Sequence, residues 1–158
     1  MKISFDSVPF AGRPPKREFA HITKRIQAAD IEIEEFRTMV LSGYTWSPCI
    51  YRDNHRKNDC FLGAELLALD FDSGIFPEVI MSRCRDLSLA PFFSYFTFRH
   101  SDQAPRFRII WRLNEFIETP AYYEACVLAL LKLFPEADRA CKDMARIYLG
   151  TDKGAFLW

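Results

Sequence analysis

No charge of one sign is in excess in this sequence, because its 158 residues include 21 lysines and arginines and 21 aspartates and glutamates. Such a chain has no overall basic field that would attract nucleic acid or an anionic membrane. A polyanionic ligand would therefore have to be held by arginines and lysines that are placed locally.

Paired cysteines and long apolar runs are also missing. The five cysteines include no Cys-x-x-Cys pair, which argues against a zinc knuckle and a redox motif. Their odd number and their scatter are typical of reduced thiols in the cytoplasm. No apolar run reaches the length of a membrane span, about 18 residues, and the first residues contain no signal-peptide core. We therefore expect a cytoplasmic protein with no membrane partner.

Apolar and aromatic residues are plentiful, at 49% and 15% of the chain. This content is enough to bury a core in one compact domain. We therefore expect a single domain over 1–158, with an N-terminal lobe at 1–60 and a second module at 61–158. Only nine residues follow the last strand that we predict, so we expect the domain to be part of a longer protein.

The apolar run at 65–74 ends in two aspartates, Asp70 and Asp72, which are separated by one residue. Side chains alternate across a strand, so both carboxylates point to the same face, about 6–7 Å apart. Carboxylates this close repel each other unless a cation lies between them. Mg²⁺ is often held by one or two carboxylates together with substrate phosphates. An ordinary strand end, with solvated or helix-capping acids, is an equally open alternative.

The pattern from residue 65 onward predicts a β-α-β-β-α-β order of elements. The polar segment 99–105 predicts a hairpin loop, and Thr119 with Pro120 favours the start of a helix. We expect strands at 65–72, 91–98, 106–113 and 145–149, and helices at 76–87 and 119–134. This order is that of an α+β fold of the ferredoxin-like or RRM-like type.

In that topology the first and third strands are neighbours at the centre of the sheet, and the last strand borders the first. Alternation places Arg106 and Arg108 on the same face as Asp70 and Asp72. Paired acids and paired arginines on one face favour a surface that binds a metal and phosphate. A solvated face, with salt bridges between these groups, is the alternative.

Other polar residues fall near this face. His100 lies in the predicted hairpin beside the arginines, where it is as much a surface histidine as a ligand. Asp138 and Asp143 follow the second helix, and Arg146 falls in the last predicted strand. One of these acids could join the two aspartates, or all of these residues could be the charged end of a helix and its loop.

Residues 1–60 show less regular patterns. The segment 12–16 predicts a loop, and a helix is expected at 30–41, with Asp30 as its cap and Gly43 just past its end. We expect this lobe to cover the otherwise open face of the sheet and to make a cleft of it.

A polar run at 52–59 directly precedes the first predicted strand of the second module. Such runs are most often solvated loops. Its basic residues could instead contact a nucleic-acid backbone, a contact that does not depend on base sequence. The candidate DNA-binding residues are Arg52, Arg56 and Lys57.

Three segments carry a family resemblance. They are Leu-Leu-Ala-Leu-Asp-Phe-Asp-Ser-Gly at 66–74, Tyr-Phe-Thr-Phe-Arg-His at 95–100 running into Pro-Arg-Phe-Arg-Ile-Ile at 105–110, and the acidic segment 137–146. Together they resemble the catalytic domain of archaeo-eukaryotic-type primases, of the primase-polymerase kind found in plasmids, phages and mobile elements. The first two segments are the more specific, and the resemblance spans residues 43–150.

The resemblance implies an RRM-like catalytic module that performs template-directed nucleotidyl transfer from (d)NTPs in DNA replication. It implies a two-metal site for Mg²⁺ or Mn²⁺, a DNA template and primer as partners, and a fused or associated helicase. The implied catalytic and metal-binding residues are Asp70, Asp72 and Asp138. The expected triphosphate-binding residues are His100, named by the resemblance, with Arg106, Arg108 and Arg146 beside it.

Two departures from the family pattern stand out. Phe98 occupies the place of a small Ser-like residue two positions before the histidine, and the third motif offers both Asp138 and Asp143.

Two other functions share the RRM-like fold. A replication-initiator or relaxase nuclease needs a histidine pair on one strand, and the three histidines of this chain are far apart in the sequence. A non-catalytic RRM-like nucleic-acid-binding module could stack bases on Phe93 and Tyr95. Acids in the middle of the sheet would repel the backbone of bound RNA, which counts against this second alternative.

Overall fold

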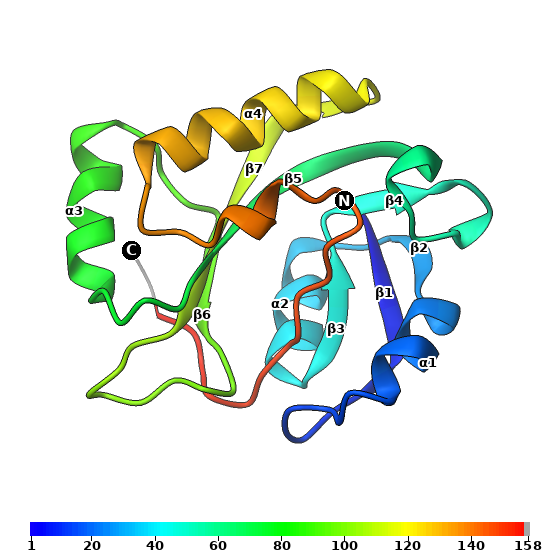
Figure 1. Cartoon of the computed structure of the whole chain (residues 1–158), viewed down its shortest axis with the longest axis horizontal. Coiled ribbons are helices and arrows are strands. Elements are labelled where there is room, and N and C mark those ends of the chain that lie inside the picture. Colours follow the sequence, from blue (N-terminus) through cyan, green and yellow to red (C-terminus); the bar gives the residue numbers. More distant parts are fainter. Residues whose placement is uncertain (157–158) are drawn as a thin grey trace.

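The computed structural model describes residues 1–156, and within them it contains two antiparallel sheets and four α-helices (Figure 1). The smaller sheet has the strand order β2-β1-β3, and the larger has the order β4-β5-β7-β6. The strands are β1 (Lys2–Pro9), β2 (Gln27–Asp30), β3 (Tyr44–Ser47), β4 (Cys49–Tyr51), β5 (Phe61–Phe71), β6 (Phe93–Phe96) and β7 (Phe107–Ile117). The helices are α1 (Glu18–Arg25), α2 (Ile33–Leu41), α3 (Pro77–Asp86) and α4 (Pro120–Leu133), with short 3-10 turns η1 (Arg52–Asn54), η2 (Asn58–Cys60) and η3 (Arg139–Lys142).

The α+β class expected from the sequence is confirmed. Elements β5, α3, β6, β7 and α4 follow one another as predicted, and β7 lies between β5 and β6. The register sets Asp70 opposite Arg108 and Ala68 opposite Ile110. Residues directly opposite on antiparallel strands point to the same face. The acid and the arginine therefore share a face, as the alternation predicted.

The other face of the larger sheet packs against α3 and α4. Leu69 and Ile109 lie in one buried cluster with Ile80 of α3 and Val127 of α4. In α4 the buried positions recur at helical spacing after Pro120, which suits the first turn because it has no N–H to satisfy. Burial of each such side chain stabilises the fold by about 1.5–3 kcal/mol.

The face that carries the acids is covered farther along the strands by the N-terminal elements. Leu66, Ala68 and Ile110 form a second buried cluster with Phe36 of α2 and Trp46 of β3. Figure 1 shows the smaller sheet and its helices on this side, with the chain after η3 running between the two halves. The acids near the end of β5 are therefore bordered by both halves of the molecule.

The strand predicted at 145–149 is wrong. Within the described residues, this segment makes only an isolated bridge, between Tyr148 and Trp46 of β3. The place beside β5 is taken instead by β4, which pairs with it in the antiparallel direction. β4 precedes β5 by a short connection, so its pairing closes a small loop at low entropic cost. The larger sheet therefore extends across residue 60, where the sequence suggested a boundary.

The N-terminal segment is more regular than the sequence suggested. Strands β1, β2 and β3 were not predicted, and α2 begins at Ile33 rather than at residue 30. Asp30 ends β2, where it is paired with Lys2, and it does not cap the helix. Gly43 does follow α2 as predicted, with a φ of 89°, and a side chain there would collide with the Phe10 carbonyl. None of the described helices has the length and apolar character needed to cross a membrane.

Candidate active site

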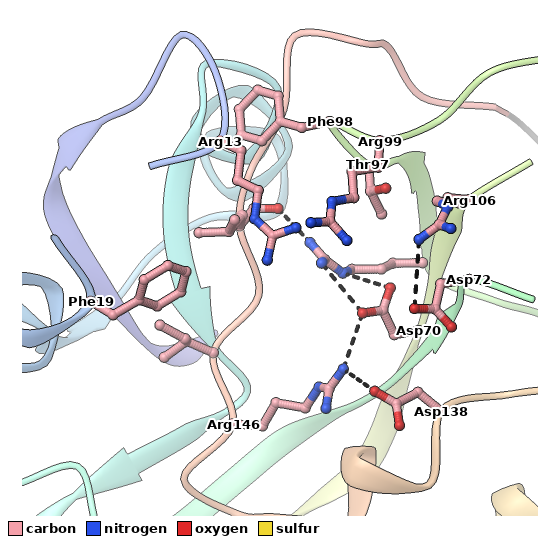
Figure 2. A pocket seen from close by; sticks show the side chains of 13 residues that line it. Arg13, Phe19, Asp70, Asp72, Thr97, Phe98, Arg99, Arg106, Asp138 and Arg146 are labelled. Carbon is pink, nitrogen blue, oxygen red and sulfur yellow. Dashed lines mark hydrogen bonds and ion pairs between the residues drawn. The ribbon is translucent and has the colours of Figure 1, made fainter. Parts of the chain in front are cut away.

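A cavity of about 260 Å³ opens beside the end of β5 (Figure 2). Its walls come from the loop after β1, from α1, from the β6–β7 loop and from the chain around η3. The lining residues are Arg13, Phe19, Asp70, Asp72, Thr97, Phe98, Arg99, Arg106, Arg108, Asp138, Arg146, Ile147 and Leu149. The three acids and three arginines expected at the site thus line one cavity.

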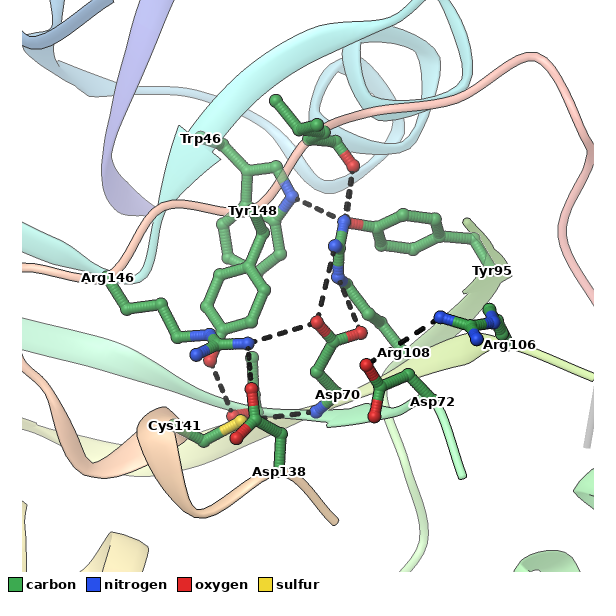
Figure 3. A network of polar contacts seen from close by, with 12 residues as sticks. Trp46, Asp70, Asp72, Tyr95, Arg106, Arg108, Asp138, Cys141, Arg146 and Tyr148 are labelled. Carbon is green, nitrogen blue, oxygen red and sulfur yellow. Dashed lines mark hydrogen bonds and ion pairs between the residues drawn. The ribbon is translucent and has the colours of Figure 1, made fainter. Parts of the chain in front are cut away.

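Asp70 is the centre of a network of charged groups (Figure 3). Its side chain is only 12% exposed. Oδ1 accepts a hydrogen bond from Arg108 Nε at 3.1 Å, and Oδ2 accepts from Arg108 Nη2 at 3.4 Å and from Arg146 Nη2 at 3.1 Å. Both oxygens of this nearly buried carboxylate are therefore neutralised by guanidinium groups.

Arg108 is fixed on several sides. Its Nη1 donates to the hydroxyl of Tyr95 at 3.1 Å and to the carbonyl of Leu149. Its guanidinium also lies 5.6 Å from the ring centroid of Tyr95 and 5.3 Å from that of Tyr148. Burial lowers the pKa of Arg108, but Asp70 and Tyr95 outweigh this effect and raise it above its ordinary value. Arg108 is therefore a permanent, immobilised positive charge.

Asp138 joins Asp70 through Arg146. A single nitrogen, Arg146 Nη2, donates to Asp138 Oδ2 at 2.7 Å and to Asp70 Oδ2. The backbone holds the same arrangement, because the Asp138 N–H donates to the Asp70 carbonyl at 2.8 Å. Burial raises the pKa of Asp138, but the Ala140 N–H and Arg146 lower it, and the net pKa lies below its usual range. Asp143, the other acid left open by the sequence, does not line the cavity and accepts from its own loop backbone.

Asp72 and Arg106 form a looser pair at the mouth of the cavity. Asp72 lies just past the end of β5, and its side chain is 58% exposed. Its Oδ2 is 3.8 Å from Arg106 Nη1. An exposed ion pair at this distance is weak, so Asp72 is the acid most accessible to a ligand.

His100 is not among the cavity-lining residues. Its ring stacks on Phe96 at a centroid distance of 3.9 Å, and its Nδ1 accepts from the Arg106 N–H at 3.4 Å. The histidine therefore lies outside the cavity lining, beside the backbone of Arg106 in the β6–β7 loop.

The basic residues before β5 also lie away from the cavity lining. Arg56 donates to the Ala145 carbonyl and to Thr23 Oγ1, so it ties distant segments together. Arg52 and Lys57 are exposed. Their contact with DNA stays a prediction.

The structure adds residues that the sequence did not place in the site. Arg13 and Phe19 reach the cavity from the N-terminal segment, and Phe98 and Arg99 reach it from the β6–β7 loop. Arg99 precedes His100, which was a signal that this loop matters. Nothing in the sequence pairs residue 13 with residue 70, because that proximity depends on how the two halves pack.

The base-stacking residues considered for a non-catalytic module are buried. Phe93 and Tyr95 are 4% and 0% exposed, and they pack against the N-terminal elements. Neither ring is accessible to a base, which argues against that alternative.

The acids of the cavity have the donor chemistry of a site for a hard divalent cation, because Mg²⁺ and Mn²⁺ prefer carboxylate oxygens. Among residues 1–156, however, no three His, Cys, Asp or Glu side chains are already arranged around a common metal position. The oxygens of Asp70 and Asp138 that face each other are instead held by Arg146. The cavity therefore has side chains of the type that binds such a cation, and Arg146 supplies positive charge between Asp70 and Asp138.

Comparisons with known proteins support the fold. No family model matches the sequence, and no curated protein matches it. A solved structure that resembles it is the AEP domain of the primase-polymerase (PrimPol) of cyanophage S-2L, with a TM-score of 0.51 and 11% sequence identity. The similarity covers 94% of this chain and 71% of that one. At this identity the likeness shows the fold alone: the chain has an α+β fold similar to that of a primase-polymerase AEP domain.

Proposed function

We propose that this protein is a DNA primase-polymerase, which transfers nucleotides from (d)NTPs to a growing strand on a DNA template. The observation that carries the proposal is the convergence of Asp70, Asp72 and Asp138 on one arginine-rich cavity. The primase-polymerase-like fold supports it. The proposal also includes an RRM-like catalytic module, a cytoplasmic location, DNA contacts by Arg52, Arg56 and Lys57, and an associated helicase.

In this proposal the three aspartates would hold Mg²⁺ or Mn²⁺. When bound, such ions would make a 3′-hydroxyl a better nucleophile and would neutralise charge on the leaving pyrophosphate. The protein contributes a pre-set orientation of Asp70, because Arg108 holds it and is itself held by Tyr95 and Leu149. A carboxylate that is already positioned loses little freedom when it engages a ligand.

The other groups have distinct parts. The lowered pKa of Asp138 favours its ionised form, so this carboxylate stays able to bind a cation to a lower pH than an ordinary aspartate would. Asp72 is exposed at the mouth and can approach substrate without breaking a strong pair. Arg106 beside it would attract the triphosphate as Asp72 engages the cation, and His100 would position the backbone of Arg106.

The test is incorporation of labelled nucleotide on a primed DNA template with Mg²⁺ or Mn²⁺. Asp72→Asn should lower incorporation by about 10²-fold or more, the scale of losing one group that stabilises a charged transition state. Asp86→Asn is the matched control, because Asp86 is an exposed aspartate at the end of α3 outside the cavity. It should retain wild-type incorporation.

Two results would contradict the proposal. One is wild-type incorporation by Asp72→Asn. The other is a wild-type protein that incorporates neither ribo- nor deoxynucleotides with either metal. Cleavage of a labelled strand without incorporation would indicate the nuclease alternative, and binding without either reaction would indicate a binding module.

A further inference from the structure

The arginines of the cavity fall into two groups. Arg106, Arg108 and Arg146 are each paired with an aspartate of the site. Arg13 and Arg99 also line the cavity, but the structure describes no hydrogen bond or ion pair for either guanidinium within residues 1–156. Both side chains are exposed. The cavity therefore contains two guanidinium groups that are free to bind a ligand.

These two arginines come from opposite halves of the molecule. Arg13 belongs to the loop between β1 and α1, and Arg99 belongs to the loop between β6 and β7. Figure 2 shows both guanidinium groups pointing into the cavity, on the side of Asp70 away from Asp138. Two like charges that face one space without a counterion repel each other, so this arrangement favours an anion between them.

The net charge of the cavity also favours an anionic ligand. Five arginines and three aspartates line it, so two positive charges are in excess. Arginine has a planar fork of donors that matches two phosphate oxygens, and it keeps its charge at any physiological pH. Two such forks from separate loops suit a chain of phosphates better than a single phosphate, since each fork can hold a different group.

We infer that Arg13 and Arg99 bind the polyphosphate end of a nucleotide, and that the loop at 12–16 thereby contacts the substrate from the N-terminal half. The identity of the ligand as a nucleoside triphosphate rests on the proposed function; the polyphosphate site itself does not. The sequence-based assignment placed His100, Arg106, Arg108 and Arg146 on the triphosphate, and of these only Arg106 keeps that role here. Arg108 and Arg146 are occupied by Asp70, and His100 lies outside the cavity lining.

The test measures binding without catalysis. Inorganic tripolyphosphate is titrated by calorimetry into the wild-type chain, Arg13→Gln and Arg99→Gln, at fixed ionic strength and without divalent metal. Each substitution should weaken binding by about ten- to a hundredfold, the effect of one charge-assisted contact. The matched control is Arg17→Gln, which removes an exposed arginine four positions from Arg13 that does not line the cavity. It should change the affinity less than about twofold, as expected for a distant exposed charge.

The inference is overturned if the wild-type chain does not bind tripolyphosphate, if Arg13→Gln and Arg99→Gln bind it normally, or if Arg17→Gln weakens binding as much as they do. Its failure can be distinguished from failure of the proposed function. Tripolyphosphate binding that depends on both arginines, in a protein that incorporates no nucleotide, would retain this site and reject the polymerase. Normal incorporation, with an unchanged KM for nucleotide in both variants, would retain the proposed function and reject this polyphosphate site.

Discussion

Asp70 shows how the site is built at the scale of single residues. The sequence predicts that two neighbouring carboxylates repel each other unless a cation lies between them. The structure supplies the cations from the chain itself, because Arg108 and Arg146 contact both oxygens of Asp70. The acid is thus part of the fold as well as a candidate for chemistry, whereas the exposed Asp72 is free of that structural role.

A first prediction compares the free energies of unfolding when Asp70, which is part of the fold, and Asp72, which is not, are each replaced. Asp70→Asn leaves Arg108, which is 8% exposed, without its charged partner. Loss of one member of a buried ion pair costs about 3–5 kcal/mol. Asp72→Asn should change the free energy of unfolding by less than about 0.5 kcal/mol, because it alters an exposed group. Urea denaturation followed by tryptophan fluorescence measures both. Equal stability of the two variants would show that the Asp70 network does not hold the fold.

A second prediction concerns Arg146, which bonds Asp70 and Asp138 through one nitrogen. A divalent cation that uses the same oxygens must displace this guanidinium. Arg146→Gln should therefore bind Mn²⁺ about tenfold more tightly, the equivalent of one charge-assisted hydrogen bond. Calorimetric titration measures this, with Arg106→Gln as the contrast, since Arg106 is 3.8 Å from Asp72 and holds it loosely. Weaker Mn²⁺ binding by Arg146→Gln, with an unchanged circular dichroism spectrum, would mean that the arginine supports the metal site.

At the scale of elements, the acids are placed by the pairing of β5 with β7 and by the chain that follows α4. That chain is fastened to α3, because Arg83 donates to both oxygens of Glu136, at 2.6 and 2.7 Å. Glu136 lies only two residues before Asp138. An ion pair that is not part of the cavity lining thus helps to position the third acid of the site.

This ion pair gives a prediction on acid stability. The hydrogen bond from Arg83 lowers the pKa of Glu136, and although burial raises it, the net pKa lies below the ordinary value of 4.5. A group with a lowered pKa stabilises the folded state above its unfolded pKa, and this contribution is lost as the pH falls through the folded value. Between neutral pH and the acidic range, the free energy of unfolding of Glu136→Gln should therefore fall by up to about 1 kcal/mol less than that of the wild type. The difference is limited to this size because the pair is partly exposed.

Urea denaturation at a series of pH values provides the test. Glu124→Gln on the exposed side of α4 is the control, and it should keep the wild-type pH dependence. An identical pH dependence in Glu136→Gln would show that the Arg83 pair is not formed in solution.

The elements that the sequence predicted best are those with the clearest periodicity. α3 and α4 have apolar positions at helical spacing, β7 alternates, and β5 contains a continuous apolar run, so composition and spacing were enough to place them. The alternation also assigned Asp70 and Arg108 to one face, and their register bears this out. These predictions depend only on residues close together in the chain.

The elements that the sequence missed depend on distant contacts. The segment 145–149 is apolar apart from Arg146, as a buried strand would be. However, its Tyr148 hydroxyl donates to the Ala68 carbonyl and Arg146 reaches Asp70, so it lies across the sheet instead of extending it. β4 is too short for a clear pattern and forms because β5 offers it an edge. The position of Arg13 relative to the cavity follows from packing between the two halves, and that of His100 from its stacking on Phe96 and its bond with the Arg106 N–H. Periodicity encodes neither contact.

At the scale of the whole molecule, the larger sheet is covered on one face and partly covered on the other. α3 and α4 cover one face, and the N-terminal elements cover part of the other. The last described segment joins the halves: Trp46 and Tyr148 exchange backbone hydrogen bonds at 2.9 and 2.7 Å, and Tyr95 is bridged to Ala155. The cavity exists only where these parts meet, so the integrity of the site depends on the N-terminal half.

The last prediction tests that dependence with a chain that begins at Asp59. Such a chain lacks the cover over Leu66, Ala68 and Ile110, which are at most 2% exposed in the intact protein. It also lacks β4, so β5 becomes an open edge. Exposed apolar surface and unpaired edge strands both promote association. We expect soluble oligomers or precipitate on size-exclusion chromatography, and strong binding of a hydrophobic dye.

A single substitution tests the packing of the N-terminal half on the sheet without removing any part of the chain. Phe36→Ala removes a fully buried ring of α2 that contacts Trp46, Phe92 and Phe93. It should cost about 3–5 kcal/mol of stability through the cavity it leaves. Phe76→Ala is the control, and it should have a much smaller effect, because Phe76 is 54% exposed. If the chain from Asp59 were monomeric and folded, and Phe36→Ala were as stable as Phe76→Ala, the N-terminal half would not be part of the same folding unit, and its arginine could not be a fixed wall of the cavity.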